Sequence, residues 1–414
     1  MKSFIPIFTG FLVAGSLLQA QETKLVDGPF LSALRTEAAR NHPAASSGKL
    51  RATAAGRDIL GVRLWDDPMV GLTLMAARAS MRADDGDIRL SYEQPLPKPG
   101  LYQANLAKAE ALHRAELENS RSSSLEVAAA AAKDAIELAL LDESIALQTA
   151  QLKWFSSMAE NASQMAQNPD GNSIDALRLE SELVRENQIL QAARRTRDSA
   201  SRSLNLRLGR PLDSPWPALR LGTHSAPMPI VITEIARIPR VNPKVRSMKE
   251  MATAASAETR IATRERLPQF AVAVDANLYS GGDVRSMGLG LKMSLPYINR
   301  ASNDAKIDAS KFREIAATSD TEATRLAVAS NVLTATTEAA NAAAQARAYS
   351  GEIYQRALQA TQAVEAAWLS SQSSLTDLLD SNRLLFSIRL AQRRFVAQQL
   401  AALEDLNLLV PNSH

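Results

Sequence analysis

The sequence predicts a mainly α-helical fold with membrane-type β-strands, arranged as two tandem copies of a helix, a β-hairpin and a long helical hairpin. Three observations predict it. Proline landmarks recur in the same order in both halves of the 414-residue chain, two long stretches lack proline, and four short segments alternate between apolar and polar residues.

The proline landmarks indicate an internal repeat. Pro43 and Pro68 lie 25 residues apart, and Pro243 and Pro268 repeat that spacing. Because landmarks that recur in one order indicate a duplicated unit, we expect two copies joined by a proline-rich linker. The predicted segments are a signal peptide at 1–20, a first copy at 21–210, the linker at 211–240 and a second copy at 241–414.

The stretches between prolines predict long helices. No proline lies between Pro99 and Pro169 or between Pro296 and Pro411, and alanine is abundant in both stretches. Helices of this length are typical of a coiled-coil tube rather than a globular domain. The expected long helices cover about 102–167 and 173–208 in the first copy and about 299–368 and 374–408 in the second.

The alternating segments predict strands. In one of them Val272, Val274 and Leu278 alternate with small or charged residues such as Asp275. Each segment has about ten residues, enough to cross a bilayer when tilted. A soluble two-hairpin sheet packed on helices is the alternative, since alternation alone shows only a half-buried sheet. The expected strands cover about 68–78, 87–95, 268–279 and 285–296.

One chain cannot complete such a sheet within a membrane. Four strands are too few for a closed barrel, and an open sheet edge in lipid leaves backbone groups unpaired. We therefore expect other copies of the chain to supply the missing strands, with two copies as the minimum.

The N-terminus has the pattern of a secretory signal. Lys2 precedes an apolar segment at 4–18, and a small-residue cleavage site ends at Ala20. An uncleaved anchor is the alternative. Because the chain has no cysteine, we expect no lipidated N-terminal cysteine.

Composition argues against catalysis. The 47 basic and 44 acidic residues leave a formal charge of +3, which gives no electrostatic reason to expect nucleic-acid binding. With no cysteine and only four scattered histidines, neither a thiol nucleophile nor a metal centre is expected. Glycine motifs for nucleotides are also absent. We expect no enzyme activity and no cofactor.

Several local motifs resemble the TolC-like outer-membrane efflux family. His42-Pro43 and Asn242-Pro243 are similar to the Asn-Pro pair that starts the first helix of each repeat in that family. Residues 93–100 resemble its strand-exit motif, especially in the heavy-metal cation efflux branch, with Leu101 where a lysine usually follows. Residues 374–381 resemble its helix-tip motif, with serines in place of the usual glycine.

The resemblance implies an assembly and a function. Three chains would form one 12-stranded β-barrel in the outer membrane of a Gram-negative bacterium, surrounded by lipid and continued into the periplasm by an α-helical barrel. The partners would be a periplasmic adaptor protein and an inner-membrane pump of the RND type. The chain would be the exit duct for metal cations or small toxic compounds. The alternatives are a non-channel periplasmic coiled-coil adaptor or scaffold, and the outer channel of a type I protein secretion system.

Candidate gating residues follow from the helix-tip motif. Asp377 and Asp380 lie three residues apart on one helix face, and in a trimer they would form two stacked carboxylate rings. The alternative is helix capping, since Ser374 and Asp377 have the capping-box spacing. Asp175 and Arg178 hold the matching places in the first copy and are candidate tip or adaptor contacts. Their alternative is a solvated, salt-bridged helix end.

Charged residues on the polar strand faces are candidates for the barrel lumen, where they would tune the local field. They are Arg89, Glu93, Asp275 and Lys292. Aromatic residues near the strand ends are candidates for interfacial girdles, with ordinary strand composition as the alternative. They are Trp65, Tyr92, Tyr279 and Tyr297.

Overall fold

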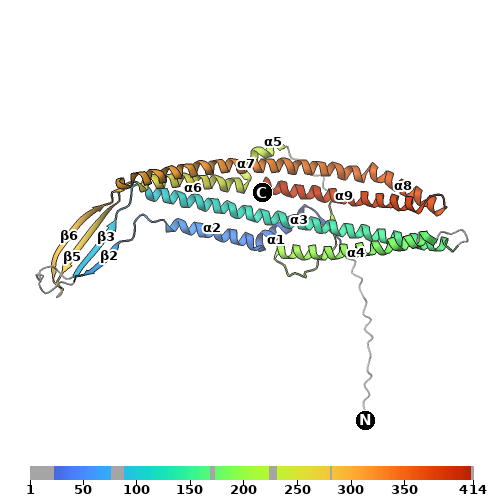
Figure 1. Ribbon diagram of the computed structural model, residues 1–414, viewed down its shortest axis with the longest axis horizontal. Coiled ribbons are helices and arrows are strands. Elements are labelled where there is room, and N and C mark those ends of the chain that lie inside the picture. The colour runs from blue at the N-terminus through green and yellow to red at the C-terminus, as the bar shows by residue number, and fades with distance from the viewer. Residues whose placement is uncertain (1–22, 76–87, 168–172, 223–230, 280–281, 412–414) are drawn as a thin grey trace, which may run out of the picture.

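The computed structural model is an elongated helical rod with a β-sheet at one end (Figure 1). It describes residues 23–75, 88–167, 173–222, 231–279 and 282–411. The expected signal peptide, 1–20, lies outside the described residues.

The helices of the two copies correspond in order. The first copy contains α1 (Gly28–Asn41), α2 (Pro43–Gly61), α3 (Leu101–Met165) and α4 (Ser173–Leu208). The second contains α5 (Val231–Val241), α6 (Pro243–Glu265), α7 (Arg300–Ser350), α8 (Glu352–Leu369) and α9 (Leu375–Leu409), with a short 3-10 helix at Pro296–Asn299 before α7. In each copy, one path of helix runs the length of the rod: α3 in the first copy, and α7 followed by α8 in the second (Figure 1). Shorter helices cover its two halves, α2 and α4 in the first copy and α6 and α9 in the second. At 65 residues, α3 is about 100 Å long.

The residues that precede Pro43 and Pro243 each cap the start of a helix. His42 Nδ1 accepts a hydrogen bond from the amide of Ala44 at 3.2 Å, and Asn242 Oδ1 accepts one from the amide of Val245 at 3.1 Å. The proline that follows each cap occupies the first helical turn, where its missing N–H leaves no bond unmade. The same local chemistry therefore begins α2 and α6.

The prediction of one continuous helix over 299–368 was wrong. The helix breaks at Gly351, whose φ of −95° and ψ of −120° lie far from helical values, and α8 begins at Glu352. A Cβ at this glycine would lie 3.3 Å from the carbonyl oxygen of Arg347, so a larger residue would fit tightly at the break. By contrast, α3 in the first copy runs unbroken.

The strands form two sheets. The larger has the order β2 (Met69–Leu74), β3 (Ile88–Pro95), β5 (Phe270–Leu278), β6 (Val284–Met293), and each neighbouring pair is antiparallel. The smaller pairs β1 (Lys24–Val26) with β4 (Leu219–Leu221) in parallel. The predicted proline-rich linker at 211–240 contains regular structure. It contains β4 and ends in α5, because Leu219 and Leu221 are buried in the central core and their amides bond to Asp142 and Glu143.

Small residues allow the helices to pack closely at the middle of the rod. Ala131, Ala132, Ala135 and Ala139 on α3 are fully buried there. A second buried cluster lies at the tip of the rod away from the sheet, and a third joins α5, α7 and α9. Full burial of a leucine side chain contributes about 1.5–3 kcal/mol, so these clusters account for much of the rod's cohesion.

Candidate functional site

The strand register brings the polar residues of all four long strands onto one face of the sheet. Thr73 pairs with Arg89, Arg89 with Asn277, and Asn277 with Ser286. One step along, Ser91 lies between Gly71 and Asp275. Because side chains alternate between faces with period two, each such row places its members on one side.

The four predicted lumen residues lie together on this polar face. Lys292 Nζ lies 2.5 Å from Glu93 Oε2, and Arg89 Nε donates to Asn277 Oδ1 at 3.1 Å. Asp275 lies in the register row of Ser91. An ion pair between exposed side chains, such as Lys292 with Glu93, adds little to the free energy of folding. Its main consequence is to fix where the charges lie on the polar face.

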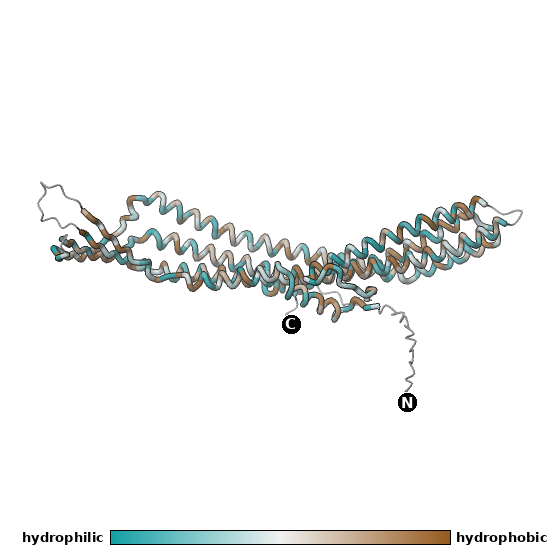
Figure 2. The backbone as a smooth tube through the Cα atoms, turned by 90° about the horizontal axis from the view of Figure 1, so that it is seen from below, coloured by the Kyte–Doolittle hydropathy of each residue, from teal (hydrophilic) through white to brown (hydrophobic). Residues whose placement is uncertain are grey.

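The opposite face of the sheet is apolar and exposed. Val70, Leu289 and Leu291 are 77%, 80% and 68% exposed, and they share this face with residues from β3 and β5. Figure 2 shows brown, hydrophobic residues recurring along the strands at the end of the rod, between hydrophilic ones. A sheet that exposes so many large apolar side chains requires a nonpolar environment or a partner surface.

Both edges of the sheet are open within the described chain. β2 and β6 are the outer strands, and each pairs with one neighbour only. A row of unpaired backbone groups on each edge is a template for pairing with another strand. The sheet is therefore complementary to further copies of itself.

The four aromatic candidates lie at different places along the sheet. Trp65 and Tyr297 are exposed and lie where the sheet joins the helices. Tyr279 directly follows β5 at the far end, where the guanidinium of Arg285 lies 6.0 Å from its ring centre. Tyr92 lies within β3, with its hydroxyl 3.4 Å from Gln94 Oε1. Trp65, Tyr297 and Tyr279 thus lie beyond the strand ends, at the two ends of the sheet.

At the other end of the rod, Asp377 caps α9. Ser374 Oγ accepts from the amide of Asp377 at 3.1 Å, and the Asp377 carboxylate accepts from the hydroxyl of Ser374 at 2.7 Å. Together with the bond from the Ser374 amide, this forms a complete capping box. In the turn between α8 and α9, Ser371 has a φ of +60°, a left-handed conformation that glycine usually supplies.

Asp380 is the exposed acid of the tip. Its side chain is 68% exposed and lies 3.6 Å from the guanidinium of Arg383. Arg383 also bonds Glu182 on α4 at 2.9 Å, and this pair connects the two helical hairpins. In the first turns of α4, Asp175 is half-buried and Arg178 is exposed.

The Glu182–Arg383 pair was missed from the sequence. The two residues are 201 positions apart, close to the repeat offset, so they hold corresponding places in the two copies and carry opposite charges. That correspondence was the only available signal. A buried cluster beneath the pair holds the hairpins together, with Phe155, Trp368 and Leu378 among its members.

Among the residues that the structure describes, no group of three or more His, Asp or Glu side chains is arranged to hold a metal ion. None of the helices there has an apolar stretch long enough to cross a membrane, and Figure 2 shows hydrophilic and hydrophobic residues alternating along them.

Comparison with known proteins identifies the fold. Residues 239–410 match the family model for the outer membrane efflux protein. The outer-membrane channel OprN is similar over 94% of this chain and 91% of its own, with a TM-score of 0.80 and 15% identity. The outer membrane protein VceC from Vibrio cholerae is similar over 92% of this chain and 96% of its own, with a TM-score of 0.78 and 14% identity.

A third structure, CusC, has been described in terms of folding and transmembrane channel formation. It is similar over 92% of both chains, with a TM-score of 0.72 and 14% identity. No curated protein sequence matches the chain. The predicted fold class is confirmed by the similar structures, and the resemblance to the outer-membrane efflux family is confirmed over residues 239–410.

Proposed function

From the outer membrane efflux protein domain at 239–410 and the channel fold of the whole chain, we propose that the protein is the exit duct of a tripartite export system. Its sheet would lie in the outer membrane and its helical rod would extend into the periplasm. The duct performs no catalysis and takes its substrate from a periplasmic adaptor and an inner-membrane pump of the RND type.

The observation that carries this proposal is the four-stranded sheet. It has an apolar face exposed to its surroundings, a polar face carrying all four charged candidates, and two open edges. A sheet with these properties is satisfied when its edges pair with other copies, its apolar face meets lipid and its polar face lines water. Three copies would supply twelve strands, a size that encloses a lumen.

The tip supports a gate built from acidic residues. Asp377 is held by its capping box, while Asp380 is exposed beside Arg383. Around a threefold axis these positions form rings of carboxylates, which favour cations and could hold the entrance closed through bound cations or hydrogen bonds. Asp175 and Arg178 would lie at the matching tip of the first hairpin and meet the adaptor.

The proposal also includes a class of substrate. The resemblance of residues 93–100 to the metal-efflux branch favours export of metal cations or small toxic compounds. A secretory signal at 1–20 would direct the chain across the inner membrane. A soluble periplasmic scaffold would expose the apolar face of the sheet to water, which is unfavourable. This argues against the scaffold alternative.

Conductance in a planar lipid bilayer tests the duct and its gate. Asp377→Asn plus Asp380→Asn removes both charges while asparagine keeps an acceptor for the cap. We expect the wild-type protein to conduct weakly and the double variant to conduct several-fold more. Asp320→Asn, an exposed change on α7, is the control and should leave conductance unchanged.

Two results would contradict parts of the proposal. Wild-type conductance unaffected by the double substitution would leave a channel and reduce Asp377 to a helix cap. Protein that stays soluble without detergent and never inserts into the bilayer would refute the duct itself.

A further inference from the structure

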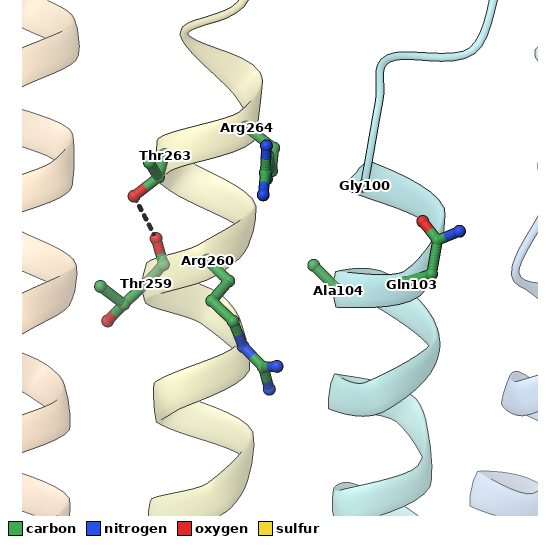
Figure 3. Close-up of a pocket in the computed structure, with 7 residues that line it drawn as sticks. All are labelled: Gly100, Gln103, Ala104, Thr259, Arg260, Thr263 and Arg264. Atoms are coloured by element: carbon green, nitrogen blue, oxygen red, sulfur yellow. Dashed lines mark hydrogen bonds between the residues drawn. The ribbon is translucent and has the colours of Figure 1, made fainter.

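A pocket lies between α3 and α6 where the helical rod meets the sheet (Figure 3). It has a volume of about 420 Å³. Beside it, residues 96–100 lead from β3 into α3, and residues 266–269 lead from α6 into β5. Its lining residues are Gly100, Gln103, Ala104, Thr259, Arg260, Thr263 and Arg264.

Two arginines of this pocket have no acidic partner among the residues that the structure describes. Arg260 and Arg264 lie one turn apart on α6 and are both exposed, and neither takes part in an ion pair there. Like charges at this spacing repel each other. In Figure 3, Arg260 extends from α6 toward α3. The pair is therefore a concentration of positive charge that no ion pair neutralises within the described residues.

Three acids lie near the pair along the chain or on neighbouring helices. Glu265 directly follows Arg264 and is exposed, but it forms no ion pair with either arginine among the described residues. The other two are paired with different cations. Glu258 is paired with Lys108 at 3.0 Å and lies 3.8 Å from Arg313. Asp304 is paired with Arg266 at 2.9 Å. The pocket lining itself contains no acidic residue, so nothing within it neutralises the two guanidinium groups.

The start of α3 adds to the positive potential. Gly100 precedes the helix in a left-handed conformation, with a φ of +77°, and no side chain caps the first turn. A Cβ on Gly100 would lie 3.1 Å from Nε of Arg264, so glycine is what lets this guanidinium pack against the helix start. Unsatisfied N–H groups at a helix N-terminus favour anions. The amide of Gln103 lies on the same pocket wall.

Compensation of the α6 helix dipole does not explain this arrangement. Arg264 does lie in the last turn of α6, where a cation offsets the partial negative charge. However, Lys98 Nζ already donates to the backbone oxygen of Glu265 at 2.7 Å, at the same helix end. Arg260 lies a turn further in, where the dipole effect has fallen off.

We propose that this pocket binds an oxyanion of the phosphate class, gripped by the guanidinium groups of Arg260 and Arg264. Guanidinium forks match phosphate oxygens in pairs, and the first turn of α3 with the Gln103 amide would supply further donors. The phosphate could belong to a phospholipid headgroup or to a soluble molecule. The lipid source rests on the proposed function, since it requires the adjoining sheet to lie in a bilayer, whereas the oxyanion site does not.

Binding to the full-length, detergent-purified oligomer tests the site. Titration calorimetry with inorganic phosphate measures the soluble source, and native mass spectrometry of phosphatidylglycerol retained per oligomer measures the lipid source. We expect Arg260→Gln plus Arg264→Gln to weaken binding in at least one arm by roughly 10- to 100-fold, since two charge-assisted contacts are lost. Arg260→Lys plus Arg264→Lys should lose less, because the charge remains without the fork.

Arg266→Gln is the matched control. It removes the same charge two residues along from Arg264, but from a guanidinium that Asp304 already satisfies. A loss for phosphate alone identifies a soluble ligand, and a loss for phosphatidylglycerol alone identifies a lipid headgroup. Unchanged binding in both arms, or an equal loss in Arg266→Gln, overturns the proposal. If wild-type protein fails to form channels while the double glutamine variant still loses phosphate binding, the proposed function fails and the site stands.

Discussion

Glu404 on α9 shows how a buried charge is held at the middle of the rod. Its side chain is almost fully buried, and one carboxylate oxygen lies 3.3 Å from the guanidinium of Arg35 on α1. Burial raises the pKa of Glu404, and the positive charge of Arg35 only partly opposes that rise. The folded protein therefore favours the neutral form of this side chain more than the unfolded chain does.

The sign of the pKa shift predicts how stability changes with pH. Because the pKa of Glu404 is higher in the folded protein than in the unfolded chain, its contribution to stability is complete below the pKa of the unfolded chain, which is about 4.3 for glutamate. That contribution is lost as the pH rises through the pKa of the folded protein. Glu404→Gln mimics the neutral form, so it should raise the unfolding temperature at pH 8 and have little effect near pH 4. Thermal unfolding followed by circular dichroism in detergent, at both pH values, measures this.

Glu322 on α7 is the control for that measurement because its shift has the opposite sign. Its pKa is lowered, chiefly by a hydrogen bond from Arg325, and the carboxylate is exposed. Glu322→Gln should leave the unfolding temperature at pH 8 unchanged or slightly lower. A gain at pH 8 in both variants would show that charge removal in general stabilises the protein, which would contradict the role given to burial at Glu404.

At the scale of single elements, successive residues of β6 lie alternately on the apolar and the polar face of the sheet. Leu289 is 80% exposed on the apolar face, and the adjacent Gly288 lies on the polar face, opposite Asp275, with open space where a Cβ would be. Neighbouring positions on one strand therefore offer a matched pair for testing which face meets lipid.

Leu289→Arg and Gly288→Arg place the same side chain on opposite faces of β6. An arginine facing the bilayer midplane costs about 2–4 kcal/mol, whereas one facing a water-filled lumen does not. We expect Leu289→Arg to reduce the fraction of protein that floats with liposomes and Gly288→Arg to insert normally but alter conductance. Normal insertion by both variants would mean that the apolar face does not meet lipid.

The elements differ in how well the sequence could predict them. Alternation along a strand shows which of its residues share a face, so the polar faces carrying Arg89, Asp275 and Lys292 were predictable from period two alone. The break at Gly351 was not, because a single glycine is tolerated within a helix unless tertiary packing requires otherwise. The pairing of β1 with β4 was also missed, since three residues are too few to show a period.

The candidate site divides in the same way. The capping box at Asp377 is local and could be read from the spacing to Ser374. The bond between Glu182 and Arg383 depends on how two long hairpins pack against each other. Nothing within either hairpin specifies that contact, and only the repeat offset relates the two positions.

At the scale of the whole molecule, duplication explains both the rod and its open sheet. Each copy contributes a β-hairpin at one end and a helical hairpin to the other, so the two copies lie side by side along their full length (Figure 1). The sheet order then leaves a strand of the first copy, β2, at one edge and a strand of the second, β6, at the other. Edges from different copies suit head-to-tail closure of a ring.

Disulfide cross-linking of the two edges tests that closure and counts the subunits. The chain has no cysteine, so an introduced pair can react only with itself. One cysteine replaces Val70 or Leu72 on β2, and a second replaces Met287, Leu289 or Leu291 on β6. Within one sheet, β2 and β6 are separated by β3 and β5, so a bond can form only between chains.

For pairs in register we expect a non-reducing gel with monomer, dimer and trimer and nothing larger, because a closed ring of three uses every edge. A ladder continuing beyond trimer would indicate an open filament or a larger ring, and a series that stops at dimer would refute threefold closure.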